Sequence, residues 1–145
     1  MAEGDLTVFE EAKGYMIDGG WESVDDFKLA ILDNTTAPTA ADSVPTLGDY
    51  SQVGSAGSYT AGGISIGDLG TLVVEAGGTM TFDSPTNPTW PSNGSNDTDA
   101  FWGLIYNDTD GTDRAIAYVD LGGPKDMSGG SLTVTWAVTG IFTIT

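Results

Sequence analysis

The chain has 145 residues, of which 21 are Asp or Glu and only 4 are Lys or Arg, so its formal net charge is −17. It contains no His and no Cys, which excludes a thiol nucleophile, a Ser–His dyad, a zinc site of the usual kind and a disulfide framework. So acidic a chain repels the phosphates of DNA and RNA, and we therefore expect no nucleic acid among its partners.

The first twenty residues carry the clearest helical pattern in the chain. Apolar side chains recur three or four positions apart there, at Leu6, Phe9, Ala12 and Met16. Thr7 followed by Glu10 fits a capping box, and Gly19-Gly20 fits a left-handed stop. The pattern predicts one short helix that needs a surface to pack on, because a helix of this length is marginal alone.

After this helix the hydrophobic period changes to two, which predicts a strand over residues 26–32. Residues 33–49 and 84–98 are rich in Pro, Thr, Asp, Asn and Ser, and are predicted to be long surface loops. Between them, short strands broken by glycines are predicted at Tyr50–Val53, Ser58–Thr60 and Ile64–Ile66.

Three further pairs of strand-like segments are each separated by a turn signal. Gly77-Gly78 predicts a tight hairpin between residues 71–76 and 79–83. Asp110-Gly111 and Thr139-Gly140 predict turns in the last third of the chain. The flanking segments are 101–106 with 114–121, and 131–137 with 141–145. The whole pattern predicts a mainly β fold: a single antiparallel β-sandwich or barrel-like domain over residues 1–145, with one short N-terminal helix.

The densest group of oxygen ligands lies at residues 107–113, which read NDTDGTD. Asp108, Asp110 and Asp113 are spaced closely enough for a Ca²⁺ site to be considered. The distant Glu and flanking helices of an EF-hand are missing, and hairpin turns also favour Asp, Asn and Gly. We therefore favour a turn, and expect no metal or other cofactor.

The aromatic residues and the paired acidic residues are candidates for binding or catalytic sites. The four tryptophans are Trp21, Trp90, Trp102 and Trp136. Trp102 and Trp136 lie in strand patterns that predict core positions, whereas Trp90, in a Pro-rich loop, is the best candidate for an exposed contact residue. Acidic pairs such as Asp25-Asp26 and Asp97/Asp99 are expected by chance in so acidic a chain, and are predicted to be solvated. We expect no catalytic residues and no enzymatic activity.

No membrane partner is expected either. The N-terminal residues lack the basic and apolar segments of a signal peptide. The most apolar stretches, among them residues 101–106 and 140–145, have the length of a strand and are too short to span a bilayer.

A resemblance covers most of the chain, from Phe9 to Thr145. It is carried by FKLAILDNTTAPTAADSVPTLGDYSQV, YTAGG, FWGLIYNDTDGTDRAIAYVDLGG and the closing LTVTWAVTGIFTIT. In this order the segments resemble a family of small virion proteins of tailed bacteriophages. The resemblance implies a structural protein of the virion, of the capsid decoration or cement kind. Its implied partners are the phage major capsid protein, on the outer capsid surface, and further copies of itself, by analogy as trimers or another symmetric ring.

An alternative hypothesis belongs to a different functional class. In that hypothesis the chain is a tail-associated or head-fibre-associated module that binds host-surface glycan through Trp90 and the two long loops. Copy number per virion separates the two hypotheses, because a capsid protein is far more numerous than a neck, tail or fibre protein.

Overall fold

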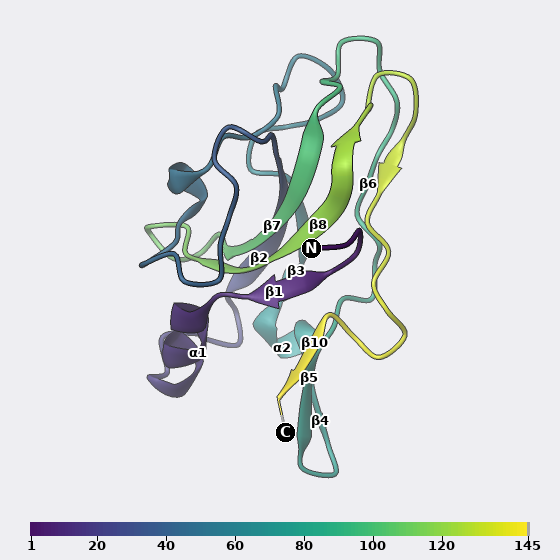
Figure 1. Ribbon diagram of the computed structural model, residues 1–145. Coiled ribbons are helices and arrows are strands. Elements are labelled where there is room, and N and C mark those ends of the chain that lie inside the picture. The colour runs from purple at the N-terminus through teal and green to yellow at the C-terminus, as the bar shows by residue number, and fades with distance from the viewer. Residues whose placement is uncertain (145) are drawn as a thin grey trace.

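A five-stranded antiparallel sheet forms the larger part of the computed structural model, which describes residues 1–144 (Figure 1). Its strand order is β1-β8-β7-β2-β3. The bounds of these strands are Leu6–Val8 for β1, Asp26–Leu32 for β2, Ile64–Asp68 for β3, Ala100–Asn107 for β7 and Ala115–Lys125 for β8. We call this the main sheet.

Two smaller antiparallel sheets complete the fold. The first has the order β10-β5-β4 and is called the small sheet; the second pairs β6 with β9. Their bounds are Val73–Ala76 for β4, Thr79–Phe82 for β5, Phe142–Ile144 for β10, Thr89–Trp90 for β6 and Leu132–Thr133 for β9. The helices are α1 (Glu10–Ile17) and α2 (Leu69–Leu72), with a 3₁₀ turn at Leu47–Asp49. This confirms the predicted mainly β, antiparallel, sandwich-like fold with one main helix.

The centre of the main sheet is buried on both of its faces. Strand β2 lies between β7 and β3, and all four residues 29–32 are fully buried. The strand itself was predicted correctly. Beyond the end of β3, the segment around Gln52 pairs with the remaining edge of β2: the Val53 N–H donates to the Ile31 carbonyl, 3.1 Å away. Buried apolar residues from the main sheet, α1 and the small sheet join in one cluster.

Tyrosine side chains tie the segment between β2 and β3 to this core. The Tyr59 hydroxyl donates to the Gln52 side chain at 2.7 Å and accepts from the Ile31 N–H at 3.2 Å. Burial raises the pKa of Tyr59 to about 12, although the Ile31 N–H opposes that change. The Tyr106 hydroxyl donates to the Gly62 carbonyl at 2.7 Å, and burial, with the Asp108 carboxylate beside it, raises its pKa too.

The N-terminal helix is shorter than the sequence pattern predicts. Residues 6–8 form β1 and pair with β8, so the helix begins only at Glu10. The predicted capping box is absent, because Phe9 occupies the N-cap position and no side chain caps the helix. Strand pairing with β8 overrides the local helical pattern here. The predicted end is confirmed: α1 finishes at Ile17, and Gly19 has a φ of +70°.

The hairpin predicted around Gly77-Gly78 is confirmed. Both glycines have positive φ, +61° and +83°, and Ala76 pairs with Thr79 across the turn. The hairpin predicted between residues 101–106 and 114–121 is confirmed by the pairing of β7 with β8. Of the three predicted short strands, Ile64–Ile66 lies within β3. By contrast, Ser58–Thr60 is not a strand, and Tyr50–Val53 contributes only a bridge from Gln52 to Leu32.

The last predicted hairpin is wrong. Residues 131–137 and 141–144 do not pair with each other, because β9 pairs with β6 and β10 pairs with β5; Thr145 lies outside the described residues. A turn does form, with the Gly140 N–H donating to the Ala137 carbonyl at 2.9 Å. Gly140 packs so closely on the small sheet that an added Cβ would lie 2.5 Å from Thr81 Cγ2. This contact directs the chain onto the small sheet.

Candidate binding groove

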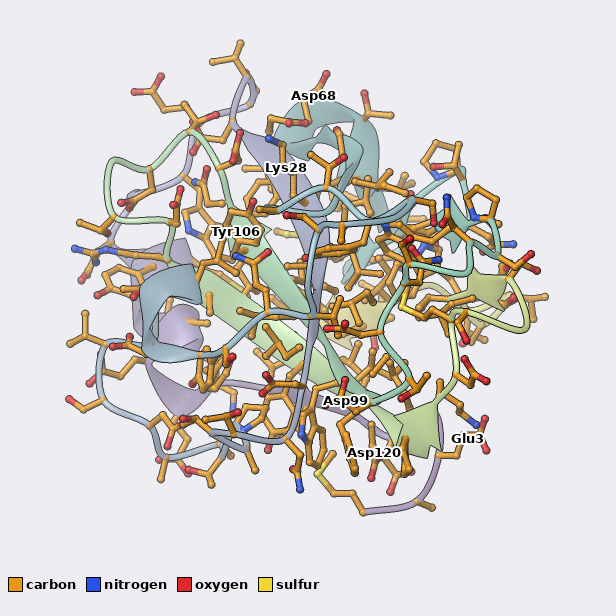
Figure 2. The ribbon with its side chains drawn as sticks, turned by 90° about the horizontal axis from the view of Figure 1, so that it is seen from above. Glu3, Lys28, Asp68, Asp99, Tyr106 and Asp120 are labelled. Atoms are coloured by element: carbon orange, nitrogen blue, oxygen red, sulfur yellow. The ribbon has the colours of Figure 1, made fainter. Side chains whose placement is uncertain are left out.

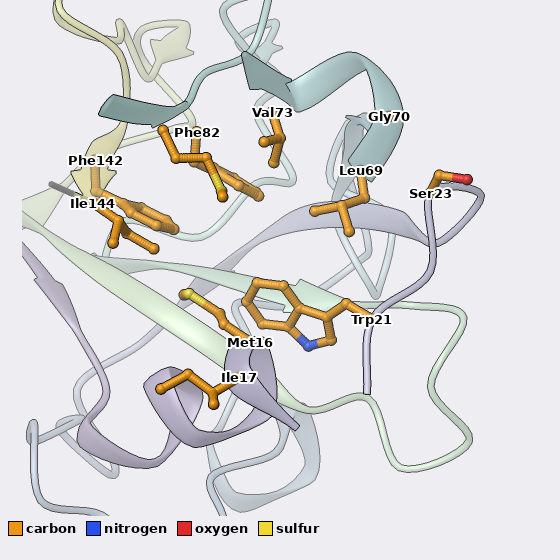
Figure 3. A pocket seen from close by; sticks show the side chains of 11 residues that line it. Met16, Ile17, Trp21, Ser23, Leu69, Gly70, Val73, Phe82, Phe142 and Ile144 are labelled. Atoms are coloured by element: carbon orange, nitrogen blue, oxygen red, sulfur yellow. The ribbon is translucent and has the colours of Figure 1, made fainter. Parts of the chain in front are cut away.

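One face of the small sheet is lined with apolar side chains. The cross-strand register aligns Val73, Phe82 and Phe142 in one row and Glu75, Met80 and Ile144 in the next. Since residues on one face of a sheet alternate along each strand, these six side chains point the same way, and Glu75 on the outer strand β4 is the one charged residue among them. The five apolar side chains form one wall of a groove (Figure 3).

The opposite wall comes from the end of α1 and the segment that follows it. Met16 and Ile17 of α1, with Trp21, face the small sheet, and Leu69 of α2 lies at the end of the groove nearest Ser23 (Figure 3). The space between the walls is about 520 Å³. A second hollow of about 440 Å³ adjoins it and shares four lining residues with it. Its lining is Val8, Lys13, Met16, Ile17, Phe142, Thr143 and Ile144. We call the two together the α1–β10 groove.

A chain of aromatic rings connects the groove to the core. Trp21 meets Phe27 edge-on with ring centroids 5.4 Å apart, and Phe27 meets Phe82 edge-on at 5.6 Å. Phe82 in turn stacks on Phe142 at 4.8 Å with an 8° angle between the ring planes. Because Phe27 is fully buried in β2, these contacts hold both walls of the groove at a defined separation.

Side chains at the rim of the groove are unusually exposed for apolar residues. Ile17 is 85% exposed, and Met80 and Ile144 are each 45% exposed. Single exposed apolar side chains are normal on protein surfaces, but a contiguous patch around a groove is typical of an interaction site.

The electrostatics of the groove differ from those of the rest of the molecule. The residues lining both hollows include no Asp or Glu and one cation, Lys13, in a chain with a net charge of −17. The other three cations form ion pairs elsewhere: Lys28 with Asp108, Arg114 with Asp110, and Lys125 with Glu3. Figure 2 shows acidic side chains at widely separated places, with Glu3 and Asp120 at the other end of the view from Asp68.

The acidic segment 107–113 forms the turn between β7 and β8, as favoured from the sequence. The Asp110 carboxylate accepts from the Thr112 N–H at 2.8 Å, and the Asn107 side chain accepts from the Thr109 N–H at 2.9 Å. Burial opposes ionisation of Asp110, but the hydrogen bonds from Thr112 and the nearby Arg114 guanidinium together lower its pKa. These are the side-chain-to-backbone bonds that stabilise turns.

Asp113 lies in the same turn, but its pKa is shifted in the opposite direction. Burial and the negative charges of Asp108 and Asp110 raise its pKa, which Lys28 only partly offsets. Asp108 is paired with Lys28 at 2.7 Å rather than directed at a shared centre. Among residues 1–144, no three His, Cys, Asp or Glu side chains gather closely enough to hold a metal ion.

The structure excludes Trp90, the best sequence candidate, as an exposed contact residue. Trp90 is only 2% exposed, and its ring lies 6.1 Å from that of Tyr59. The surrounding loop is polar, but β6 pairs with β9 and turns the indole inward. Trp102 and Trp136 are partly buried against the core. The Trp136 indole N–H donates to the Thr86 carbonyl at 2.9 Å.

The acidic pairs have structural roles. Asp25 is buried, contrary to the prediction of a solvated residue, and its carboxylate accepts from the Asn107 side chain at 2.8 Å. The Asp97 carboxylate accepts from the Gly54 N–H and so joins two loops. Within residues 1–144, no helix combines the length and apolar character needed to cross a bilayer.

The α1–β10 groove was not foreseen from the sequence. One feature of the sequence could have indicated it: the closing segment, residues 140–145, has no charged residue although the chain as a whole is strongly acidic. Comparison with models of known families, with curated proteins and with solved structures gave no match.

Proposed function

We propose that this domain is a capsid decoration or cement protein of a tailed bacteriophage. In this role it attaches to the outer surface of the capsid and stabilises contacts between subunits of the major capsid protein. The observation that carries the proposal is the α1–β10 groove: a charge-poor apolar surface on an otherwise strongly acidic domain. The bacteriophage context comes from the resemblance of residues 9–145 to small virion proteins.

The groove supports a binding role. Its lining offers side chains that exclude water, and its polar side chains come from Lys13, Ser23 and Thr143. Covering such a surface releases water from apolar groups, which is the dominant favourable term in most protein–protein association. No nucleophile–base pair stands in the groove, since the chain has neither His nor Cys and no carboxylate lines it.

Copies are proposed to sit as trimers, or as another symmetric ring, about symmetry axes of the capsid. Each copy brings 17 net negative charges, so neighbouring copies repel one another. Attachment to the capsid therefore has to outweigh this repulsion, and an apolar contact does so without depending on salt. We expect capsid attachment to persist or strengthen as ionic strength rises.

The alternative function, binding of host-surface glycan, depended on an exposed Trp90. Trp90 is buried and paired with Tyr59, so it offers no free face for a sugar ring. Reproducible binding on a glycan array would be needed to revive that function.

The direct test adds the purified protein to capsids of the parent phage from which this protein is missing. Wild-type protein should sediment with the capsids, and cryo-electron microscopy should show density at many equivalent positions on the shell. Ile17→Asp and Met80→Asp place a charge in the groove at exposed positions and should abolish attachment without unfolding the domain. Val138→Asp is the matched control, because Val138 is fully exposed and outside the groove.

Density confined to the tail would refute the capsid assignment. Equal attachment of the two groove variants and the Val138→Asp control would refute the role of the groove while leaving the capsid assignment standing.

A further inference from the structure

The direction of the main-chain groups in β10 follows from the neighbouring hairpin. Ala76 and Thr79 flank a two-residue turn and form its closing hydrogen-bonded pair, so alternate residues of β5 bond to β4. The Asp83 N–H, which donates to the Leu72 carbonyl at 2.8 Å, continues this alternation. Met80 and Phe82 therefore direct their N–H and C=O groups toward β10, and Phe82 accepts from the Ile141 N–H at 2.8 Å.

It follows that the edge of β10 that faces away from β5 has free main-chain groups at Thr143. Its neighbours Phe142 and Ile144 are opposite Phe82 and Met80, so they bond to β5, and the N–H and C=O of Thr143 point away from the sheet. Within the described chain no further strand pairs with β10 on that side. Thr143 is exposed and lines the α1–β10 groove, so these groups open onto it.

The two edges of the small sheet differ in protection. Charged residues and Pro on an edge strand discourage pairing with another chain. The outer strand β4 carries Glu75, whereas β10 consists of Phe142, Thr143 and Ile144 and carries no charge. The unprotected edge is the one beside the groove.

A strand added to β10 would pair with the free main-chain groups of Thr143 and would also cover the apolar face of the groove. Its main chain would bond to Thr143, and every second side chain would continue the apolar face formed by Phe142 and Ile144. These side chains would then cover Met16 and Ile17 on the opposite wall. A helix in the groove would cover the same apolar atoms but would leave the main-chain groups of Thr143 without partners.

Charge determines which kind of strand fits. The groove is lined by Lys13 and by no carboxylate, so a carboxylate on the incoming segment is attracted at the Lys13 end. A second copy of this chain would bring 17 net negative charges with it, and its own closing strand has no carboxylate side chain to offer Lys13. Charge complementarity therefore favours a different protein as the occupant.

We propose that the α1–β10 groove binds an extended, mainly apolar segment of a partner protein, which adds to the free edge of β10 and places its one carboxylate beside Lys13. The proposal deepens the proposed function and rests on it for the identity of the partner, which would be the capsid. The mode of binding rests on β10, α1 and the charge of the groove alone.

The main test removes one N–H group. Pro is tolerated on an edge strand where its N–H would face solvent, so Thr143→Pro should fold and lose the donor that faces the groove. Glu75→Pro is the matched control, because its N–H faces outward on the opposite edge of the same sheet. Circular dichroism and thermal melting verify that both variants fold.

The probe is a fluorescent octapeptide in which Thr alternates with Val and the last residue is Asp. Thr143→Pro should weaken its binding about tenfold, from the loss of a main-chain hydrogen bond in a desolvated edge and of the strand geometry around it. Glu75→Pro should bind as the wild type does. The same peptide with N-methyl groups on alternate residues keeps its side chains but should lose binding as well.

The charge element has its own controls. Lys13→Glu should weaken binding of the Asp-ended peptide and improve binding of a Lys-ended one, each by about two- to fivefold. Lys125→Glu makes the same change in net charge on the residue paired with Glu3, away from the groove, and should have a much smaller effect.

Three outcomes would overturn the proposal. One is equal binding of the peptide to Thr143→Pro and wild type, which would show an apolar contact without strand addition. Another is the absence of binding by any of the peptides. The third is self-association of the wild type that Thr143→Pro abolishes, which would identify a second copy as the occupant.

Capsid reconstitution separates this proposal from the proposed function. If wild type and Thr143→Pro attach to capsids equally, strand addition is wrong and the capsid role stands. If the peptide results hold but wild type does not attach, the groove binds a strand of another protein and the capsid role is wrong.

Discussion

The main sheet and the small sheet are built from similar residues but end in different environments. In the main sheet, β2 is covered on both faces and residues 29–32 have no exposed surface. In the small sheet, Val73, Phe82 and Phe142 pack inward, while Met80 and Ile144 of the next row remain 45% exposed. The first sheet is a finished core, and the second has an apolar face that the chain itself leaves partly uncovered.

This difference shows where stability and binding are located. Residues of the main sheet hold the fold, so their substitution should act on the free energy of unfolding. Residues at the rim of the groove contribute little to folding, so their substitution should act on binding. The following predictions test that division.

The largest change in the free energy of unfolding is expected at Gly63, which packs directly against the main chain of β2. An added Cβ on Gly63 would lie 1.9 Å from the Leu29 carbonyl oxygen, at a φ of +78°. Gly63→Ala should therefore lower the free energy of unfolding by more than about 4 kcal/mol. Gly123→Ala is the control: its φ is +96° but nothing lies within 4 Å, so the loss should be about 1–2 kcal/mol. Urea denaturation measures both, and equal losses would show that the close approach at Gly63 is unimportant.

The next effect compares one apolar truncation in each sheet. Leu104 is fully buried in β7, and Leu104→Ala should cost about 2–5 kcal/mol because it leaves a cavity. Met80→Ala, at the half-exposed rim of the groove, should cost less than about 1 kcal/mol. Chemical denaturation gives both values. A loss at Met80 as large as that at Leu104 would contradict the view that the groove contributes little to folding.

A smaller, stabilising effect is expected from stiffening the small sheet. Gly77 has a φ of +61°, an added Cβ there would meet nothing within 4 Å, and it is the first residue of a two-residue hairpin turn, where Asn is favoured. Gly77→Asn should raise the free energy of unfolding by about half a kcal/mol by restricting the unfolded chain. Gly77→Val, which is β-branched and strained at positive φ, should lower it instead. The urea midpoint measures both, and the same sign for the two variants would refute this account of the turn.

The smallest effects are expected at the turn between β7 and β8, and they have opposite signs. The raised pKa of Asp113 means that its ionised form costs stability above that pKa, and that the cost disappears as pH falls through it. The lowered pKa of Asp110 means that its ionised form contributes stability above the ordinary pKa near 4, which is lost as pH falls further. Both carboxylates are largely solvated, so each effect should be within about half a kcal/mol.

At pH 7, Asp113→Asn should therefore stabilise the protein and Asp110→Asn should destabilise it, although both remove one negative charge. Thermal melts at pH 7 and at pH 3 measure this, and the two variants should converge at the lower pH. A common sign at pH 7 would indicate that net charge alone controls stability at this turn.

The local patterns in the sequence predicted elements whose partners are adjacent in the chain. Strand β2, the β7–β8 hairpin and the β4–β5 hairpin were predicted correctly, because alternation and turn residues determine them directly. The errors arose where distant pairing overrides local pattern. Residues 6–8 are helical in periodicity but pair with β8, and the closing strand pairs with β5 rather than with its neighbour in sequence.

The candidate site was beyond the reach of sequence alone for the same reason. The groove brings together Met16 and Ile17, Met80 of β5 and Ile144, which are far apart in the chain and meet only once the small sheet has formed. Trp90 was a candidate contact residue because it lies in a Pro-rich loop, whereas pairing of β6 with β9 accompanies its burial. The turn at residues 107–113 was interpreted correctly because its bonds are local.

The burial of Tyr59 and Tyr106 bears on how the net charge of the protein changes with pH. With no His and no Cys, the chain holds no side chain that ordinarily gains or loses a proton between about pH 6 and 8. Their burial raises both tyrosine pKa values, so these hydroxyls stay protonated into alkaline solution. Since tyrosine ordinarily ionises only near pH 10, the side chains add little buffering capacity between about pH 6 and 8. A surface coated with it should keep a constant electrophoretic mobility across that range, so changes of environmental pH would leave its mutual repulsion with other such surfaces unaltered.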